Sequence, residues 1–370
     1  MKRKIRILYT IPNFNTAGSG KALLNIASRL DRNKFEPHLC CAHTKGGFFE
    51  KVKESGIPVH IFQSWESVKL SFENYKKISE ITRNFKKIKP DIIHSFHYSS
   101  DFSEAIAAKM SGSKWIFTKK NMSWGSASWK IRSYLSDAII TTNSDMIKEF
   151  YQGNKKLHLI SRGVNTNEFV PFNRNDELYK ELGFNEKDRI LITVANIVPV
   201  KGIEILLKAF QKVSETSPDC KLIILGDYNS DYAMKLKENT ERSSLNGKVI
   251  FPGKVLNVKE YLNISELFIL PTLKKGEGSP VSVLEAMALK KYVLGSDVPG
   301  IRDLLSSFKE LLFEAENSDD LALKINFFLN LSKDQIEKKG NELRDEVLNN
   351  FTIDIEVKKH EEIYEKLAGN

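Results

Sequence analysis

The stretch from Pro271 to Leu289, PTLKKGEGSPVSVLEAMAL, decides the fold of the second half of this chain. It follows the apolar run Leu267–Leu270, crosses a loop with two glycines and enters a helical pattern. Ser279 is the expected N-cap and Pro280 the expected first helical residue, where a missing N–H does no harm. The unpaired N–H groups at such a helix start make a natural anion site.

Two carboxylates flank this predicted anion site. Glu277 precedes the expected cap, and Glu285 lies six residues after Ser279, roughly 9 Å further along a helix axis. The layout suits a sugar nucleotide: one acid for sugar hydroxyls, the helix start for the diphosphate, and the other acid for the ribose. On spacing alone, a charged loop and a solvent-facing Glu285 are the simpler interpretation, because acids near helix starts are favoured by the dipole.

Length and composition predict a two-domain protein of the reducing cytoplasm. A chain of 370 residues is too long for one core. The three cysteines, Cys40, Cys41 and Cys220, have no metal-ligand spacing. No segment approaches the roughly 18 uncharged apolar residues of a membrane span. The basic and then apolar N-terminus is broken by Arg6 and Pro12, so we interpret it as a buried strand rather than a signal peptide.

Charge is unevenly distributed along the chain. Residues 1–165 contain 28 Lys+Arg and 13 Asp+Glu, a net charge of +15. Residues 166–370 contain 28 and 34, a net charge of −6, which gives the overall +9. The basic half suggests an anionic partner: a membrane surface, a phosphorylated acceptor or nucleic acid. An asymmetric surface that serves only solubility is the alternative.

Strands alternate with helices in both halves, which predicts two parallel sheets, each covered on both faces. The expected strands are residues 4–10, 35–42, 58–62, 91–95, 115–118, 138–142 and 157–160, then 189–195, 221–225, 249–251, 267–270, 292–295 and 312–313. The linker is expected between Gly163 and Asn175. A last helix is expected at 353–367.

Three further features bear on chemistry. Gly18, Ser19 and Gly20 are expected in a loop after the first strand; the loop fails as a P-loop, because Asn15 and Ala22 replace its glycine and hydroxyl residue, yet it allows close approach of an anion. His94 and His97 follow the fourth expected strand, at the edge where such folds bind ligands, and no zinc-binding spacing is present.

The third feature is a lysine that could neutralise a diphosphate in a chain that lacks a metal-binding motif. Because the chain has no Asp-x-Asp, a diphosphate would have to be neutralised by donors and cations of the protein. Lys201, in ANIVPVKG after the strand at 189–195, is the obvious cation, although a solvated lysine is an equally simple interpretation.

Together these pieces resemble the retaining GT-B glycosyltransferases of family 4. EGSPVSVLEAMA is similar to that family's E-x7-E signature, with Glu277 and Glu285 as its acids. ANIVPVKG is similar to its phosphate-binding segment, and SRGVNTNEFVP to its interdomain linker. In two places the chain departs from the family: Asn196 replaces the usual arginine five residues before Lys201, and the usual His-x-His is His94-Ser95-Phe96-His97. The lost cation removes a charge-assisted hydrogen bond of roughly 1.5–3 kcal/mol.

The resemblance implies an α/β GT-B fold of two Rossmann-like domains facing a cleft. The first would comprise residues 1–165 with a crossing helix at 352–370, and the second residues 166–351. It implies catalytic roles for Glu277, Lys201 and His97, and an acceptor side at Gly18, Ser19, Gly20 and His97. The implied donor site comprises Lys201, Asn196, Gly253, Val255, Glu277, Gly278, Ser279, Pro280, Val281, Ser282 and Glu285.

The expected activity is transfer of a sugar from a nucleotide-diphosphate sugar to a saccharide or lipid-linked acceptor in surface polysaccharide synthesis. The resemblance implies retention of configuration, no metal and no further cofactor. We expect a cytoplasmic protein, peripheral at the inner face of the membrane, and no nucleic-acid partner. Trp124, Trp129, Lys130 and Arg132 form an interfacial patch in one interpretation; in the other the tryptophans belong to the core. A non-catalytic binding protein, a basic nucleic-acid-binding protein and a sugar-nucleotide epimerase are the alternatives.

Overall fold

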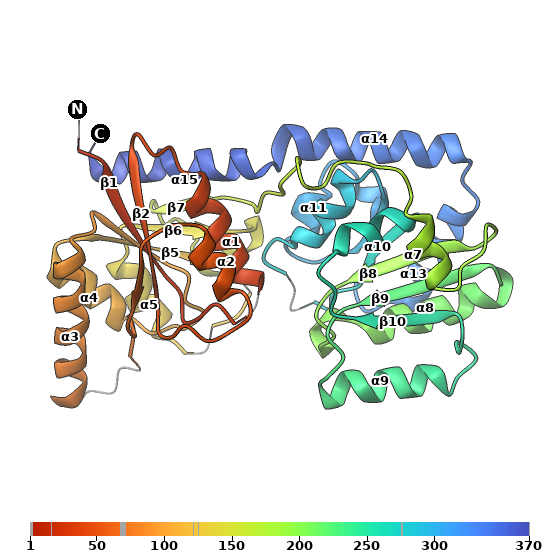
Figure 1. Ribbon diagram of the computed structural model, residues 1–370, viewed down its shortest axis with the longest axis horizontal. Helices are drawn as coiled ribbons and strands as arrows, with labels where there is room; N and C mark the ends of the chain where they lie inside the picture. The colour runs from red at the N-terminus through yellow and green to blue at the C-terminus, as the bar shows by residue number, and fades with distance from the viewer. Residues whose placement is uncertain are drawn as a thin grey trace. The chain divides into compact units, whose positions relative to one another are not determined.

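The computed structural model describes residues 3–15, 17–66, 72–120, 122–124, 126–274 and 277–369. The chain forms two compact units, unit 1 from Met1–Ser161 and Ile353–Asn370, and unit 2 from Arg162–Thr352 (Figure 1). The first boundary falls four residues before the expected residue 165. The reason is local, because the Arg162 N–H donates to Ser279 Oγ at 3.1 Å and Val164 forms a bridge with Thr352.

Unit 1 is built on a seven-stranded parallel sheet in the order β3-β2-β1-β4-β5-β6-β7. Side chains of β1 alternate between two cores: Ile7 and Tyr9 lie in one, and Leu8 lies in the other. Both faces of the sheet are therefore buried, as the sequence pattern predicts. The strands are β1 (Ile5–Thr10), β2 (Phe35–Cys41), β3 (Val59–Ile61), β4 (Ile92–Ser95), β5 (Lys114–Lys119), β6 (Ala138–Thr141) and β7 (Leu157–Leu159).

Helices from both ends of the chain cover this sheet. The last helix packs against α1 and against the middle strands β1 and β4, and brings Ile353, Val357, Ile363 and Tyr364 into the core that holds Tyr9 (Figure 1). The helices of unit 1 are α1 (Ala17–Arg29), α2 (Phe49–Glu54), α3 (Phe72–Ile88), α4 (Ser103–Ser111), α5 (Trp129–Leu135), α6 (Ser144–Phe150) and α15 (Ile353–Ala368).

Unit 2 has a six-stranded parallel sheet in the order β10-β9-β8-β11-β12-β13. Its strands are β8 (Arg189–Val194), β9 (Cys220–Leu225), β10 (Val249–Gly253), β11 (Leu267–Leu270), β12 (Tyr292–Ser296) and β13 (Leu312–Phe313). Its helices are α7 (Asp176–Glu181), η1 (Pro199–Lys201), α8 (Ile203–Thr216), α9 (Asp231–Glu241), α10 (Val258–Ile264), α11 (Val281–Ala288), α12 (Ile301–Leu304), η2 (Lys309–Leu311), α13 (Ser318–Leu329) and α14 (Lys333–Asn350).

Each sheet has one point where the direction of winding reverses. In unit 1 the chain moves outward from β1 to β3 and then resumes on the other side at β4. In unit 2 it moves outward from β8 to β10 and resumes at β11. The loops that leave the carboxyl ends of such neighbouring strands diverge, and the crevice between them is where doubly wound folds bind ligands. We therefore expect ligand sites at the loops after β1 and β4 in unit 1, and at the loops after β8 and β11 in unit 2.

The start of α1 corrects one prediction. The helix begins at Ala17, so Gly18, Ser19 and Gly20 lie in its first turn rather than in a loop. A Cβ at Gly20 would lie 2.9 Å from Cδ1 of Phe14, whose ring is fully buried. Close packing of the helix on Phe14 therefore explains why position 20 is a glycine.

The expected interfacial patch is wrong for Arg132. This residue is 1% exposed, its guanidinium lies 4.7 Å from the ring of Trp115, and it donates to Ser95 Oγ at 3.1 Å. Trp124 and Trp129 stack on each other with ring centroids 5.7 Å apart and pack against the core. The core interpretation of the two tryptophans is therefore correct.

No helix among the described residues is both long enough and apolar enough to cross a membrane.

Candidate functional site

An ion pair lies where the winding of unit 2 reverses. Lys201 ends η1, which follows β8, and Glu277 lies in the loop after β11. Lys201 Nζ forms an ion pair with Glu277 Oε1, and Thr272 Oγ1 donates to the same oxygen at 2.9 Å. The two charged side chains are 21% and 11% exposed, so both are largely shielded but still reach the surface. The structure thus brings together two residues that are 76 positions apart and were predicted for one site.

Close backbone contacts build this arrangement. Leu273 N–H donates to Val200 O at 2.9 Å, which joins the two loops. Gly202 has φ +65°, and a Cβ there would lie 2.0 Å from Pro271 O. Gly300 has φ +83°, and a Cβ there would lie 2.3 Å from Gly278 O. Only glycine meets both demands, a left-handed backbone and a neighbouring carbonyl at this distance.

The start of α11 differs from the prediction by one residue. Pro280 is the N-cap, with φ −75° and ψ 113°, and Val281 is the first helical residue. Ser279 is not the cap, because its hydroxyl accepts the Arg162 N–H instead. The first-turn residues Val281 and Ser282 still present backbone N–H groups at the helix start, next to Gly278. Glu285 follows in the second turn and is partly buried.

The other predicted donor residues lie at the same sheet edge. Asn196 is exposed two residues after β8. Gly253 ends β10 with φ +86°, and its carbonyl accepts the Gly226 N–H at 3.1 Å. Val255 packs against the core of unit 2. A Cβ at Gly253 would lie 3.1 Å from Cε1 of Tyr228.

Tyr228 and Thr272 are residues that sequence reasoning missed at this edge. No group of three or more His, Cys, Asp or Glu side chains that could hold a metal ion is found among the residues that the structure describes.

Unit 1 gathers polar side chains where its own winding reverses. Ser19, in the first turn of α1, shares a hydrogen bond with Tyr98 OH, which follows β4. Lys120, just after β5, donates to Ser19 Oγ at 3.3 Å and lies 3.8 Å from the centre of the Tyr98 ring. A Cβ at Gly18 would meet nothing within 4 Å. Tyr98 and Lys120 were not predicted, since no spacing rule connects them to Ser19.

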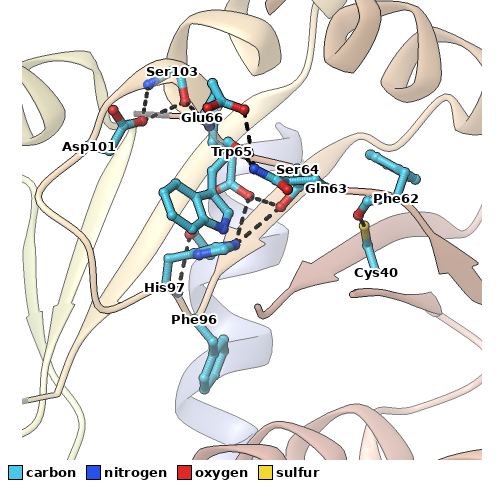
Figure 2. Close-up of polar contacts among 12 residues, drawn as sticks. Cys40, Phe62, Gln63, Ser64, Trp65, Glu66, Phe96, His97, Asp101 and Ser103 are labelled. Carbon is cyan, nitrogen blue, oxygen red and sulfur yellow. Dashed lines mark hydrogen bonds and ion pairs between the residues drawn. The ribbon is translucent and has the colours of Figure 1, made fainter. Parts of the chain in front are cut away.

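The two histidines near β4 differ in their surroundings. His94 is fully buried and bonded on both nitrogens, Nδ1 to Tyr364 OH at 2.7 Å and Nε2 to Thr118 Oγ1 at 2.8 Å. His97 is 4% exposed, and its Nε2 lies 3.2 Å from Ser64 Oγ (Figure 2). Burial, with the positive charges of Arg132 and Lys120, holds the pKa of His97 well below its ordinary value. His97 is therefore neutral at physiological pH.

Family models match most of the chain. The model "Glycosyltransferase Family 4" matches residues 16–168, and the model "Glycosyl transferases group 1" matches residues 174–344. The two matches correspond closely to units 1 and 2.

Relatives are about a quarter identical to this chain over the aligned regions. N-acetyl-alpha-D-glucosaminyl L-malate synthase of Bacillus anthracis is 27% identical over 62% of this chain and 59% of its own length. UDP-Gal:alpha-D-GlcNAc-diphosphoundecaprenol alpha-1,3-galactosyltransferase of Escherichia coli is 24% identical over 80% of this chain and 81% of its own length. The matched region of the Bacillus relative is thus under two thirds of that protein.

Solved structures share the architecture over nearly the whole length. A glycosyltransferase from Rickettsia africae aligns with a TM-score of 0.88 at 21% identity, over 99% of both chains. Anabaena HepE in complex with UDP-glucose aligns with a TM-score of 0.82 at 18% identity, over 99% of this chain and 100% of that chain. With the fold and both family matches in agreement, this chain belongs to the GT-B glycosyltransferases of family 4, which carry the group 1 domain.

Proposed function

We propose that this glycosyltransferase moves a sugar from a nucleotide-diphosphate donor to a saccharide or lipid-linked acceptor, with retention of anomeric configuration and without a metal ion. The observation that carries the proposal is the Lys201–Glu277 pair, anchored by Thr272 where the winding of unit 2 reverses. A cation, a carboxylate and a helix start are the groups that a diphosphate sugar requires at one place.

Lys201 and the start of α11 would bind the diphosphate. As the bond to the sugar breaks, negative charge grows on the leaving phosphate, and a fixed cation with backbone N–H groups stabilises it. When a donor binds, Lys201 would exchange its partner Glu277 for a phosphate oxygen. Glu277 would keep the bond from Thr272 and turn its other oxygen to the sugar hydroxyls. The phosphate, once free, would act as the base for the acceptor on the same face of the sugar.

The remaining donor residues would hold the nucleoside. Glu285, one turn into α11, would accept hydrogen bonds from the ribose. Gly253 and Val255, at the end of β10 and just beyond it, would flank the base. Asn196 stands where relatives of this family usually have arginine, so more of the diphosphate charge would be left to Lys201 and the α11 amides.

The acceptor would bind to unit 1, near Ser19 and His97. Two relatives support a lipid-linked acceptor: the E. coli protein is named for a diphosphoundecaprenol substrate, and a Campylobacter jejuni protein, 24% identical over 62% of this chain, for N,N'-diacetylbacillosaminyl-diphospho-undecaprenol. Such an acceptor would hold the protein at the inner surface of a membrane from the cytoplasm. The net +15 of residues 1–165 suits that anionic surface.

The test is sugar transfer from a panel of nucleotide sugars to undecaprenyl-diphosphate saccharides. Lys201→Ala and Glu277→Ala should each lower kcat/KM by roughly 10²–10³. Lys212→Ala and Asp319→Ala are matched controls, because they break an exposed Lys–Asp pair of the same unit, and should leave kcat/KM unchanged. Activity should survive EDTA, and NMR of the product should show the anomeric configuration of the donor. Transfer that is unaffected by Lys201→Ala or Glu277→Ala would refute the site.

A further inference from the structure

A buried chain of three polar side chains leads from His97 into unit 1. Ser64 Oγ lies 3.2 Å from His97 Nε2 (Figure 2). The same hydroxyl donates to Glu104 Oε1 at 2.9 Å. Ser64 is 3% exposed and Glu104 is fully buried at the start of α4. Glu104 Oε1 is itself 3.9 Å from His97 Nε2. The three residues come from the loop after β3, the loop after β4 and α4.

Hydrogen counting fixes the direction of this chain. A serine hydroxyl has one hydrogen to donate. Because Ser64 gives its hydrogen to Glu104, it must accept from His97, so Nε2 carries a hydrogen. His97 is neutral in this surrounding, and a neutral imidazole has only one N–H. The other nitrogen, Nδ1, therefore has a lone pair.

The tautomer of His97 bears on ligand binding because this residue lies beside a cavity. His97 lines a cavity of about 10 Å³ with Tyr98, Thr118, Lys119 and Lys120, at the carboxyl edge of the sheet. That volume holds about one water molecule. All ring hydrogen bonds of His97 to described residues use Nε2, and Nδ1 has no hydrogen bond to any of them.

We propose that Ser64 and Glu104 are positioning residues that hold His97 in its Nε2–H tautomer, so that Nδ1 accepts a hydrogen bond from a hydroxyl or N–H group of the sugar substrate. The inference rests on the proposed function for the identity of the substrate, but not for the tautomer. The proposed tautomer also limits which substrate groups can form a hydrogen bond with His97. A phosphate or carboxylate oxygen without a proton finds no donor at Nδ1, and the anionic part of the substrate must lie elsewhere.

The first measurement is the tautomer itself. Two-bond ¹H–¹⁵N NMR spectra of the full-length protein, labelled with ¹⁵N-histidine and recorded near pH 7.5, should show His97 with a protonated Nε2 and an unprotonated Nδ1. His97→Gln identifies the signal by its disappearance. A protonated Nδ1 with a bare Nε2, or a charged ring, would overturn the proposal.

The second measurement separates positioning from general support of the fold. Glu104→Leu removes the acceptor, which frees the Ser64 hydrogen to bond Nε2 and should move the proton of His97 to Nδ1. Ser64→Ala should leave a mixture of tautomers, and Ser64→Thr, which keeps the hydroxyl, should restore the wild-type spectrum. Circular dichroism checks that each variant is folded. Spectra of Ser64→Ala that match the wild type would refute the role of Ser64, even if Glu104→Leu does not fold.

The third measurement connects the tautomer to transfer. With an active donor and acceptor pair, Ser64→Ala should lower kcat/KM by roughly fivefold or more, the effect of one hydrogen bond. A substrate analogue that lacks the contacted hydroxyl should lose a similar factor with wild type and little further with Ser64→Ala. Equal further losses in both proteins would overturn the proposed contact. If no nucleotide sugar is turned over while the NMR result holds, the proposed function fails and the tautomer assignment stands.

Discussion

Gly202 holds the loop of Lys201 in place by lacking a side chain. In Gly202→Ala the new Cβ meets Pro271 O at 2.0 Å, and that oxygen belongs to backbone that cannot simply turn away. We expect the free energy of unfolding to fall by about 3 kcal/mol or more, as for other severe backbone conflicts. Urea denaturation measures the loss. The KM for the donor should rise in parallel, because Lys201 moves with the loop.

Gly247→Ala is the matched control for this prediction. Gly247 also has a positive φ, +73°, but a Cβ there meets nothing within 4 Å. Only the left-handed backbone is then unfavourable, by roughly 1–2 kcal/mol. Equal losses in the two variants would show that the contact with Pro271 is unimportant.

Three histidines, His60, His97 and His158, make stability depend on pH, because burial lowers the pKa of each. Burial lowers the pKa of His97, and burial with the charges of His38 and Arg6 lowers the pKa of His60. The unfolded chain therefore takes up protons first as the pH falls below about 6.5, and the free energy of unfolding falls with it. The histidine contribution to stability is complete above pH 6.5 and is lost toward the lower folded pKa values.

Urea denaturation between pH 7.5 and 5.5 measures this slope, which is at most about 1.4 kcal/mol per pH unit for each histidine. Glu36 and Asp137, whose pKa values lie below their usual 4.5 and 3.8, contribute only at lower pH. His97→Asn should reduce the slope. A stability that rises as the pH falls through this range would contradict the assignment.

At the scale of residues, the sequence predicts which site residues lie together when each belongs to a recognisable motif. It does not predict contacts between residues that only the folded chain brings together. Lys201 and Glu277 could be assigned to one site because each belongs to a recognisable segment. Tyr98 and Lys120 could not be placed beside Ser19, because those contacts span 79 and 101 positions of ordinary sequence. The Ser64–Glu104 pair depends on where the loop after β3 meets α4, and local spacing contains no information about that meeting.

At the scale of elements, two asparagines at helix N-caps can be compared directly, because only one of them makes side-chain cap hydrogen bonds. Asn317 caps α13, with its side chain accepting the N–H groups of Asp319 and Asp320. Asn257 precedes α10 and makes no side-chain cap bond. Asn317→Ala should lower the unfolding free energy by about 1 kcal/mol, and Asn257→Ala by much less. Thermal or urea unfolding of the two variants measures the difference, and equal losses would show that the cap bonds do not matter.

The predicted elements agree with the structure where periodicity is strong. The strands of both sheets lie within about two residues of their expected ranges, and the helical segments that the sequence predicts at 72–88 and 203–216 have the bounds of α3 and α8. The short helices α5, α6 and α7 were not predicted. The early start of α1 was missed because glycines disfavour helix interiors, and here packing on Phe14 overrides that preference.

At the scale of the whole molecule, the excess of positive charge predicts association with anionic lipid. Part of it lies on the exposed face of α3, including Lys86 and Lys87. Binding to vesicles that contain phosphatidylglycerol should weaken strongly between about 0.05 and 0.5 M salt, as screening shortens the range of these charges. Phosphatidylcholine vesicles should bind little.

Lys86→Ala with Lys87→Ala should weaken vesicle binding, at roughly 1 kcal/mol for each lysine near the surface. Lys208→Ala with Lys235→Ala, two exposed lysines of unit 2, is the matched control. Equal effects of the two double variants would place the contact elsewhere. Binding to arbitrary DNA at physiological salt would instead favour a nucleic-acid partner.

The split composition of unit 1 has a consequence for synthesis on the ribosome. Domains generally fold as units, with the N-terminal one first as the chain emerges. Here the core around Tyr9 lacks Val357, Ile363 and Tyr364 until the chain has been made as far as residue 364, whereas all residues of unit 2 have been made at Thr352. The domain that is made first would therefore be finished last. A chain truncated after residue 352 and released from the ribosome should contain a protease-resistant unit 2 joined to a protease-sensitive N-terminal sheet.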